Sequence, residues 1–310
     1  MTRKVAWLAA RSSFESASED LRELIDVSVS SSEFHRVAHE VGEAFEEIDG
    51  RKEEEWNRPV SPERPAPEAQ MNPDLLVVTA DATTVLTVAG EEHKSVWCGR
   101  AFALEARGRK ESSGRPFITE SLFTASGMNL EDFAVGLKAL AYRCGARGAK
   151  EVAFIADGAR CLWILAASLL PITMVLIQDF WHVCEHLSQL TKDLYGEDWQ
   201  GRFERWKEMI HDSRVEEVLV ELRAEKRRMD GEKGRRLSAE IGYLEGARER
   251  MDYVRYRRQG WPIGAGAIEG TCKHLVKQRF CVTGARWRRA NIPAVLALRQ
   301  AQANGDWDEY

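Results

Sequence analysis

Short hydrophobic runs alternate with amphipathic segments between residues 75 and 178. Runs of this length predict buried strands, and apolar residues spaced three and four apart predict helices. The expected strands are 75–80, then 85–88 as its extension or as a second strand, then 96–104, 117–123, 152–156 and 172–178. The expected helices are 130–144 and 160–169. Continuous apolar runs between helices favour a mostly parallel sheet that is covered on both faces. The pattern therefore predicts an α/β domain.

The segments on either side of this region are predicted to be largely helical. Apolar positions within 13–49 fit two helices with a helix-turn-helix-like spacing. The second of these helices carries several glutamates, which would repel phosphate, so we expect it to pack within the protein rather than read DNA. A proline-rich, charged stretch at 51–73 is predicted to be a linker. A long charged stretch at 181–258 and two final segments, 265–281 and 292–303, complete the expected helices.

Three carboxylates stand at positions where a folded chain seldom places an unpaired charge. Asp81 interrupts the first apolar run, Asp157 follows the run 152–156, and Glu269 lies in a glycine-rich entry to a basic, apolar segment. Burying an unpaired carboxylate is costly, and ligand sites of open α/β sheets lie beyond the carboxyl ends of strands. Each residue taken singly could cap a turn or pair with a lysine four residues on. The three together indicate a shared metal site.

Such a set of carboxylates suits phosphoryl transfer. Two bridged divalent ions can stabilise the attacking and leaving oxygens of an in-line displacement. Mg²⁺ is appropriate because it prefers oxygen ligands and retains several waters.

A second group of candidate residues lies at 178–186. His182, Glu185 and His186 spell His-x-x-Glu-His, which resembles an inverted zinc-peptidase motif, and the two histidines would share one helix face. Alternatively, Asp179 and His182 serve a nucleic-acid site, or the group only packs its helix. The apolar strand that leads into Asp179 disfavours a peptidase, since peptidase motifs of this type lie within helices.

The distribution of charge along the chain bears on the choice between these chemistries. The formal net charge of the 310 residues is −5, which alone argues against nucleic-acid binding. However, the stretch 270–304 contains no Asp or Glu and carries Lys273, Lys277, Arg279, Arg286, Arg288, Arg289 and Arg299. A solvated helix face would explain such a run, but its place directly after Glu269 favours phosphate contact.

Cysteine usage and hydropathy suggest a cellular location. The six cysteines form no Cys-x-x-Cys pair, and most lie in apolar segments, which predicts reduced, buried thiols and a reducing cytoplasm. No run of about eighteen apolar residues occurs, so no membrane contact is expected. The short apolar N-terminal run is expected to belong to the fold rather than to a signal peptide.

Four stretches of the sequence, taken together, show a family resemblance. They are Ala-Asp-Gly-Ala-Arg-Cys-Leu-Trp at 156–163, Gln-Asp-Phe-Trp-His-Val-Cys-Glu-His-Leu at 178–187, Gly-Ala-Ile-Glu-Gly-Thr-Cys-Lys-His-Leu-Val-Lys-Gln-Arg at 266–279 and Thr-Gly-Ala-Arg-Trp at 283–287. The chain resembles the ISKra-type insertion-sequence transposases, a Mutator-like branch of the DDE transposases. The resemblance covers about 13–310 and is most specific at 269–287.

This resemblance implies a ribonuclease-H-like mixed sheet with flanking helices and an α-helical insertion. The implied domains are a helical segment at 1–50, the linker, a catalytic domain at 74–182 and 260–310, and the insertion at 183–259. Asp81, Asp157 and Glu269 would be the catalytic triad and would hold two Mg²⁺ or Mn²⁺ ions. Asp179 and His182 would match the family's (Cys or Asp)-x-x-His motif in or near the active site. The DNA-binding residues would be Lys273, Lys277, Arg279, Arg286, Arg288 and Arg289.

The sequence is thus expected to encode a DNA transposase that cleaves insertion-sequence ends and joins them to target DNA. It would act in the cytoplasm, at the nucleoid, as a homodimer or larger assembly. Two departures from the family stand out: Ala82 follows the first aspartate in place of glycine, and the family's N-terminal cysteine-pair module is missing, which suggests a truncated copy. The alternatives are a nuclease or resolvase of the same fold, a zinc hydrolase using His182, Glu185 and His186, and an inactive remnant.

Overall fold

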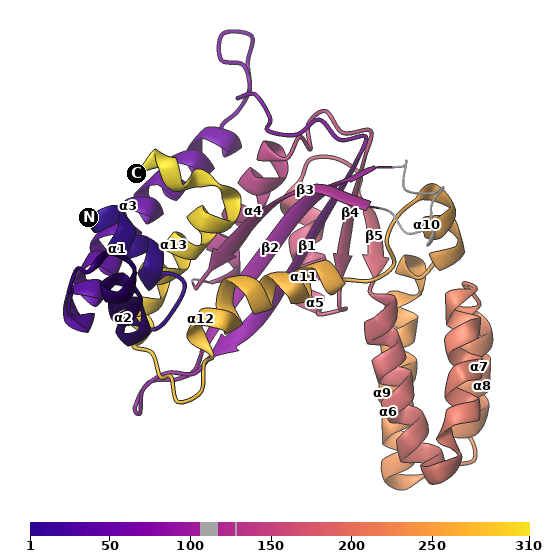
Figure 1. Ribbon diagram of the computed structural model, residues 1–310. Helices are drawn as coiled ribbons and strands as arrows, with labels where there is room; N and C mark the ends of the chain where they lie inside the picture. Colours follow the sequence, from indigo (N-terminus) through magenta and orange to yellow (C-terminus); the bar gives the residue numbers. More distant parts are fainter. Residues whose placement is uncertain (106–116, 128) are drawn as a thin grey trace.

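A five-stranded mixed sheet forms the centre of the protein (Figure 1). The computed structural model describes residues 1–105, 117–127 and 129–310. The strand order is β3-β2-β1-β4-β5, and the strands are β1 (Leu75–Val85), β2 (Lys94–Glu105), β3 (Phe117–Ser126), β4 (Glu151–Ala156) and β5 (Val175–Gln178). The predicted α/β class with a mixed sheet and flanking helices is confirmed.

The direction of the strands corrects one expectation. β2 is antiparallel to both β1 and β3, whereas β4 is parallel to both β1 and β5. The mostly parallel sheet expected from the apolar runs is therefore wrong. The connection between β1 and β2, residues 86–93, is too short for the crossover that a parallel pair requires.

Helices cover both faces of the sheet (Figure 1). One face, which includes Leu76, Val78 and Phe154, packs against α4 (Leu130–Arg143) and α5 (Arg160–Leu169). The other face, which includes Val77 and Ile155, packs against a helix in three parts and against a last helix. These are α11 (Gly266–Thr271), a π-helical segment (Cys272–Lys277), α12 (Gln278–Phe280) and α13 (Ile292–Asn304). The alternation of side chains along β1 separates these two cores.

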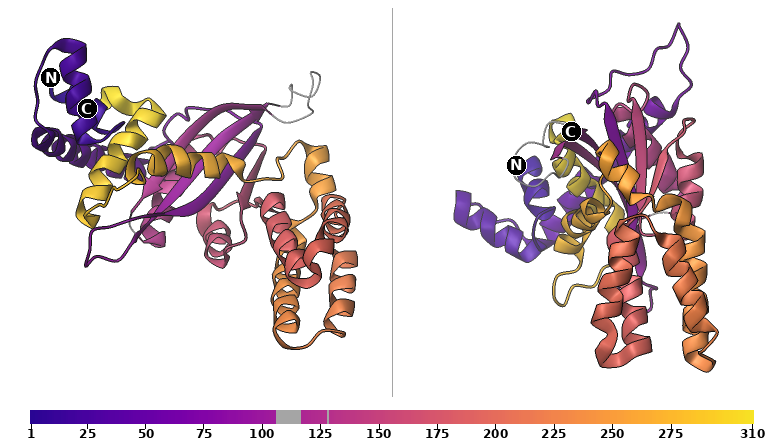
Figure 2. Two further views of the ribbon diagram at one scale, coloured as in Figure 1. Left: turned by 60° about the horizontal axis from the view of Figure 1, so that its bottom comes forward. Right: turned by 90° about the vertical axis from the view of Figure 1, so that its right-hand side faces the viewer.

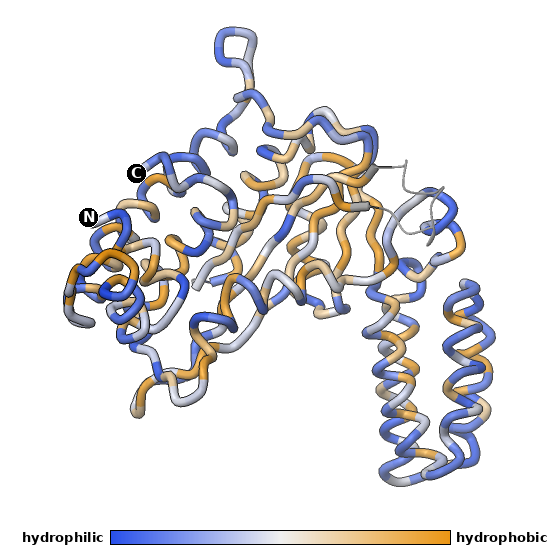
Figure 3. The backbone as a smooth tube through the Cα atoms, in the orientation of Figure 1, coloured by the Kyte–Doolittle hydropathy of each residue, from blue (hydrophilic) through white to orange (hydrophobic). Residues whose placement is uncertain are grey.

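Hydropathy along the backbone follows this layering (Figure 3). Hydrophobic residues are frequent along the central strands, while the helices mix hydrophobic and hydrophilic residues along their length. Within the described ranges, no helix combines the length and the apolar character needed to cross a lipid bilayer.

Three N-terminal helices pack on the last helix of the chain. They are α1 (Thr2–Ala9), α2 (Phe14–Ile25) and α3 (Ser31–Asn57), and their apolar faces form a third core with α13. Helix α1 was not among the expected helices, although its residues were expected to belong to the fold. Helix α3 continues through the first residues of the predicted linker, because no proline interrupts it before Pro59.

The stretch between β5 and α11 forms an array of helices that projects from the sheet beside β5 (Figure 2). Its helices are α6 (Phe180–Tyr195), α7 (Trp199–His211), α8 (Val215–Lys226), α9 (Gly231–Ala247) and α10 (Tyr253–Gln259). The hydroxyls of Tyr253 and Tyr256 donate to the carbonyls of Gln178 and Leu176 at 3.0 and 3.1 Å. Two tyrosines of this array therefore satisfy carbonyl groups on the edge strand β5.

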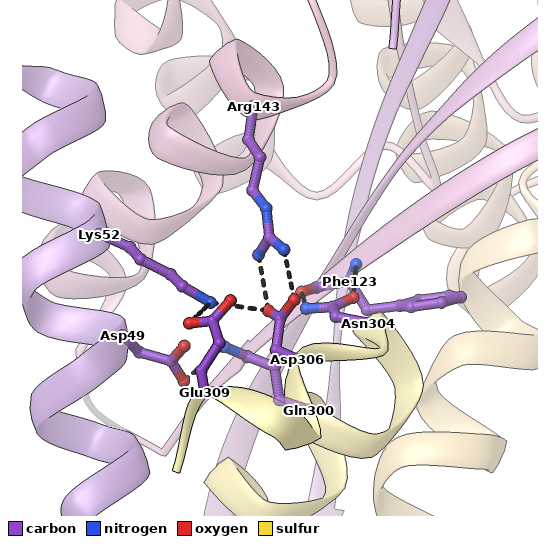
Figure 4. A network of polar contacts seen from close by, with 8 residues as sticks. All are labelled: Asp49, Lys52, Phe123, Arg143, Gln300, Asn304, Asp306 and Glu309. Atoms are coloured by element: carbon purple, nitrogen blue, oxygen red, sulfur yellow. Dashed lines mark hydrogen bonds and ion pairs between the residues drawn. The ribbon is translucent and has the colours of Figure 1, made fainter. Parts of the chain in front are cut away.

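Side chains of the last helix close the opposite edge of the sheet (Figure 4). The side-chain amide of Asn304 accepts from the backbone nitrogen of Phe123 and donates to its carbonyl, at 2.8 and 2.9 Å. Gln300 accepts from the nitrogen of Ala125 at 2.8 Å. The free backbone groups of β3 are thus paired much as another strand would pair them, which protects an edge that is otherwise open to association.

Candidate active site

Asp81 lies on β1, and Asp157 directly follows the neighbouring strand β4. The last parallel pair between β1 and β4 joins Thr79 to Ile155, two residues before each aspartate. The same register carried forward places the two aspartates side by side. Since side chains alternate along strands, and Ile155 belongs to the core beneath α11, both carboxylates belong to the face that α11 covers.

The position of Asp81 differs from the expected strand end. β1 continues to Val85, and Asp81 pairs with Cys98 of β2. The antiparallel partner β2 extends the ladder beyond the point where β4 ends. Asp81 therefore stands on a rigid strand, and only Asp157 follows the end of its strand.

The carboxylate of Asp81 is partly buried and lies in a negative environment. Its Oδ1 accepts a hydrogen bond from the Ala82 nitrogen at 2.6 Å. Burial raises the pKa of Asp81, and the charges of Asp157 and Glu269 add to the rise, while the Ala82 amide and Lys277 oppose it. Asp157 and Glu269 are therefore both close enough to Asp81 to act on it electrostatically.

Glu269 reaches this end of the sheet from α11. Ile268 and Cys272, on the same helix, are buried against the sheet, and the Cys272 thiol lies 4.0 Å from Oδ2 of Asp81. Glu269 itself is exposed. The chain enters α11 through Gly264, where a Cβ would lie 2.6 Å from Cδ1 of Trp181. That close approach accounts for a glycine in the segment that leads to Glu269.

Asp179 connects the start of α6 to the entry of α11. The side chain is buried and accepts from the Trp181 nitrogen at 2.8 Å as the cap of α6. Burial raises its pKa, the amides of Trp181, Ala265 and His182 counteract this, and the charge of Glu269 adds to the rise. Asp179 therefore belongs to the same electrostatic group as the triad and helps to fix α11 relative to the sheet.

The predicted histidines lie on the first turns of α6, near this group. Nδ1 of His182 is 3.6 Å from Oε2 of the exposed Glu185, and the ring centroids of His182 and His186 are 4.9 Å apart. His186 stacks on Tyr243 of α9, with centroids 4.1 Å apart, and its Nδ1 is 3.3 Å from Oε2 of Glu240. The ring of His186 is therefore held by contacts with α9 of the helical array.

The site offers the donors that a hard divalent cation requires. Carboxylate oxygens are the ligands that Mg²⁺ and Mn²⁺ prefer. The negative charges of Asp157 and Glu269, which raise the pKa of Asp81, would be neutralised by such an ion. In the part of the chain that the structure describes, no three or more His, Cys, Asp or Glu side chains already stand at ligand distances from a common point. The donor set suits a hard divalent cation such as Mg²⁺ or Mn²⁺ by its chemistry, and Asp81, Asp157 and Glu269 are the residues that would hold it.

The structure adds residues to the site that received no role from the sequence. Gln178, at the end of β5, is fully buried and donates from Nε2 to the carbonyl of Asp157 at 2.6 Å and to the hydroxyl of Tyr243 at 3.0 Å. Gln178 could have been identified from the sequence, because it is a polar residue at the end of an apolar run that predicts a buried strand. Tyr243 has no comparable sequence signal, because it lies far along the chain in a charged helix.

The predicted phosphate-binding residues divide into two groups. Those exposed to solvent are Lys273, Lys277, Arg286, Arg288 and Arg289. Arg279 is 3% exposed: its Nε donates to the carbonyl of Ala9 at 2.9 Å, and its guanidinium lies over the rings of Phe14 and Trp287. Burial and the charge of Arg299 lower its pKa to about 10. Arg279 therefore holds the N-terminal helices in this structure and is not available to DNA.

No model of a known protein family matches the chain, and comparison with curated proteins finds no match. The candidate site consists of an aspartate on β1, an aspartate directly after the adjacent strand β4, a glutamate on the covering helix, and exposed cations that continue along that helix. Such an arrangement is suited to binding divalent ions beside a phosphodiester backbone.

Proposed function

We propose that this protein is a DDE-type DNA transposase with a ribonuclease-H-like catalytic domain. The observation that supports the proposal most directly is that the β1–β4 register ends two residues before both Asp81 and Asp157, and that the charges of Asp157 and Glu269 both act on Asp81. The strand order, with three antiparallel and two further parallel strands, and the helical array between β5 and α11 support the fold assignment. The family resemblance of the motifs around Asp157, Asp179 and Glu269 supports the reaction.

In the proposed reaction, the protein contributes position and charge. Two bound Mg²⁺ or Mn²⁺ ions would supply stabilisation of the attacking and leaving oxygens of an in-line displacement. Asp81 holds its ligand atoms on β1 and Asp157 holds its own on the turn directly after β4, so these atoms would need little reorganisation, and Glu269 approaches from α11. Asp179 caps α6 and accepts from the Ala265 amide at the entry to α11, and His182 lies on the first turn of α6.

The exposed cations would bind the DNA backbone. Lys273 and Lys277 follow Glu269 at four-residue spacing on the same helical stretch, and Lys277 lies close enough to lower the pKa of Asp81. Arg286, Arg288 and Arg289 are exposed in the following segment. Contacts to phosphates position DNA without choosing its sequence. The DNA is therefore expected to cross α11 and its continuation.

The test is a two-part assay with the full chain. Nicking of supercoiled DNA is measured with Mn²⁺ or Mg²⁺, and joining is measured with an oligonucleotide that ends in a 3′-hydroxyl. We expect Asp157→Asn and Glu269→Gln each to reduce both activities by about a thousandfold or more. Asp74→Asn is the matched control, because Asp74 is exposed and pairs with Lys150 at the other end of the sheet.

The outcomes separate the candidate functions. Nicking and joining that both require Asp157 and Glu269 support a transposase. Metal-dependent cleavage without joining would replace it by a nuclease or resolvase. Metal binding without either activity would identify an inactive remnant. Stoichiometric zinc that is lost on replacing His182 and His186 together would favour a hydrolase.

A further inference from the structure

A side chain of the helical array reaches the turn that carries Asp157. The hydroxyl of Tyr243 on α9 lies 3.4 Å from the carbonyl oxygen of Asp157 and accepts a hydrogen bond from Nε2 of Gln178 at 3.0 Å. Gln178 donates from the same nitrogen to the Asp157 carbonyl at 2.6 Å. The main chain of Asp157 is thus held both by the neighbouring strand and by the array.

The turn after Asp157 fits closely against these two side chains. Gly158 has a φ of +111°, and a Cβ at this position would lie 2.9 Å from Nε2 of Gln178 and 3.1 Å from Cε2 of Tyr243. The Asp157 carboxylate accepts from the Ala159 nitrogen at 2.9 Å and so belongs to the same turn. A shift of Tyr243 would therefore be transmitted to the turn and to the carboxylate.

Tyr243 is itself held from the other side. Its ring stacks on that of His186, with centroids 4.1 Å apart and an angle of 10° between the planes. Nδ1 of His186 lies 3.3 Å from Oε2 of Glu240, one turn before Tyr243 on α9. Glu240 is 2% exposed, and its Oε1 has no hydrogen-bond partner among the described residues. Burying an unpaired carboxylate costs free energy. The contact between Glu240 and Nδ1 of His186 offsets this cost and fixes the ring of His186.

We propose that Tyr243, held by His186 and Glu240, is a positioning residue that sets the Asp157 carboxylate for metal binding. The inference rests on the proposed function, since it concerns the same metal site. It gives the helical array a role in the chemistry: the packing of α6 against α9 fixes the side chain that supports the turn after β4. Groups that support metal ligands from behind commonly change metal affinity by about 10- to 100-fold when removed.

The experiment measures Mn²⁺ binding directly, by electron paramagnetic resonance of the free ion, with the full chain and without DNA. Tyr243→Phe removes only the hydroxyl, and we expect Mn²⁺ to bind about tenfold more weakly or worse. Tyr256→Phe is the matched control, because its hydroxyl bonds Leu176 on β5, away from Asp157. It is expected to leave Mn²⁺ affinity unchanged. Thermal unfolding of both variants shows whether the fold is retained.

A second variant tests the support of the ring. Glu240→Gln retains the shape of the side chain and removes its charge, and a several-fold weaker Mn²⁺ affinity is expected. Equal Mn²⁺ affinity in wild type, Tyr243→Phe and Glu240→Gln would overturn the positioning role and leave the proposed function standing. Absence of Asp157-dependent Mn²⁺ binding in the wild type would overturn the metal site of the proposed function, and the positioning role with it.

Discussion

Arg143 donates hydrogen bonds from both of its terminal nitrogens to the two carboxylate oxygens of Asp306, at 2.8 and 2.5 Å (Figure 4). Both residues are buried, and Nζ of Lys52 lies 2.9 Å from the same carboxylate. Burial alone would raise the pKa of Asp306, but the Arg143 and Lys52 hydrogen bonds outweigh it and hold the pKa below its ordinary value. The pair joins α4 to the C-terminal end of the chain, next to α3.

Replacement of Arg143 should therefore destabilise the protein strongly. Arg143→Ala leaves a buried carboxylate without its main partner, and the free energy of unfolding should fall by about 3 kcal/mol or more. Lys150→Ala breaks the exposed pair with Asp74 and should cost less than about 1 kcal/mol. Urea denaturation of the two variants gives the comparison. Similar losses in both would show that the Arg143–Asp306 pair contributes no more than a surface pair.

Two partly buried carboxylates of α3, Asp49 and Glu53, should make stability depend on pH. Burial raises the pKa of each carboxyl to about 7. At Asp49 the charges of Asp306 and Glu53 add to the rise in pKa, whereas Lys52 opposes it. At Glu53 the charge of Asp132 adds to the rise in pKa. The folded state therefore binds these protons more tightly than the unfolded chain, whose carboxyl pKa is about 4. Their stabilising contribution is fully present below about pH 4 and is lost as the pH rises through 7.

We therefore expect the free energy of unfolding to fall between pH 5 and pH 8, by roughly 2–5 kcal/mol after allowance for solvent screening. The double variant Asp49→Asn, Glu53→Gln should remove most of this slope. Glu54→Gln, on the exposed side of the same helix, should retain it. Urea titrations at several pH values supply the measurement. A slope in the double variant as steep as that of the wild type would assign the pH dependence to other groups.

Substitution of two glycines of α3, Gly42 and Gly50, should have opposite effects on stability, because only Gly42 lies against α13. A Cβ at Gly42 would lie 2.4 Å from the carbonyl oxygen of Ala294, whereas a Cβ at Gly50 would meet nothing within 4 Å. Gly42→Ala should force the helices apart and cost about 1–3 kcal/mol of stability. Gly50→Ala should stabilise the helix by about 0.5–1 kcal/mol. Thermal unfolding tests the opposite signs, and a destabilising Gly50→Ala would contradict the packing argument.

Much of the secondary structure could be predicted from the sequence, because apolar periodicity depends on local residues alone. The helix expected at 160–169 is observed as α5, and the strand expected at 152–156 as β4 with one residue more. The direction in which two strands pair is not encoded in the local pattern of either strand. The expected sheet therefore had more parallel pairs than the observed one. The end of α3 was misplaced because charged residues such as those at 51–55 suit a solvated helix as well as a linker.

The candidate site was predictable to the extent that its residues have unusual local surroundings. Asp81 and Asp157 stand out because charges interrupt or follow apolar strands, and Glu269 because glycines precede it. The burial of Arg279 could not be foreseen, because its partner Ala9 lies 270 residues away in sequence. The contact of Tyr243 with the Asp157 turn likewise depends on how the array folds back on the sheet.

Neutralising Lys277 should weaken DNA binding and shift the pH dependence of cleavage. Lys277→Gln removes an exposed cation on the helical stretch after Glu269, so affinity should fall to a similar degree for duplexes of any sequence. The slope of log affinity against log salt should become shallower by about one if the lysine contacts one phosphate. Fluorescence anisotropy with a labelled duplex at several KCl concentrations measures both quantities.

The same variant has a second consequence, since Lys277 lowers the pKa of Asp81. Without this lysine the pKa of Asp81 should rise further, and the acidic limb of the cleavage profile should move to higher pH. Lys150→Gln, which removes an exposed lysine at the start of β4, should change neither the salt slope nor the pH profile. An unchanged salt slope in Lys277→Gln would remove this residue from the DNA-binding surface. An unchanged pH profile would show that its charge does not act on Asp81 during the reaction.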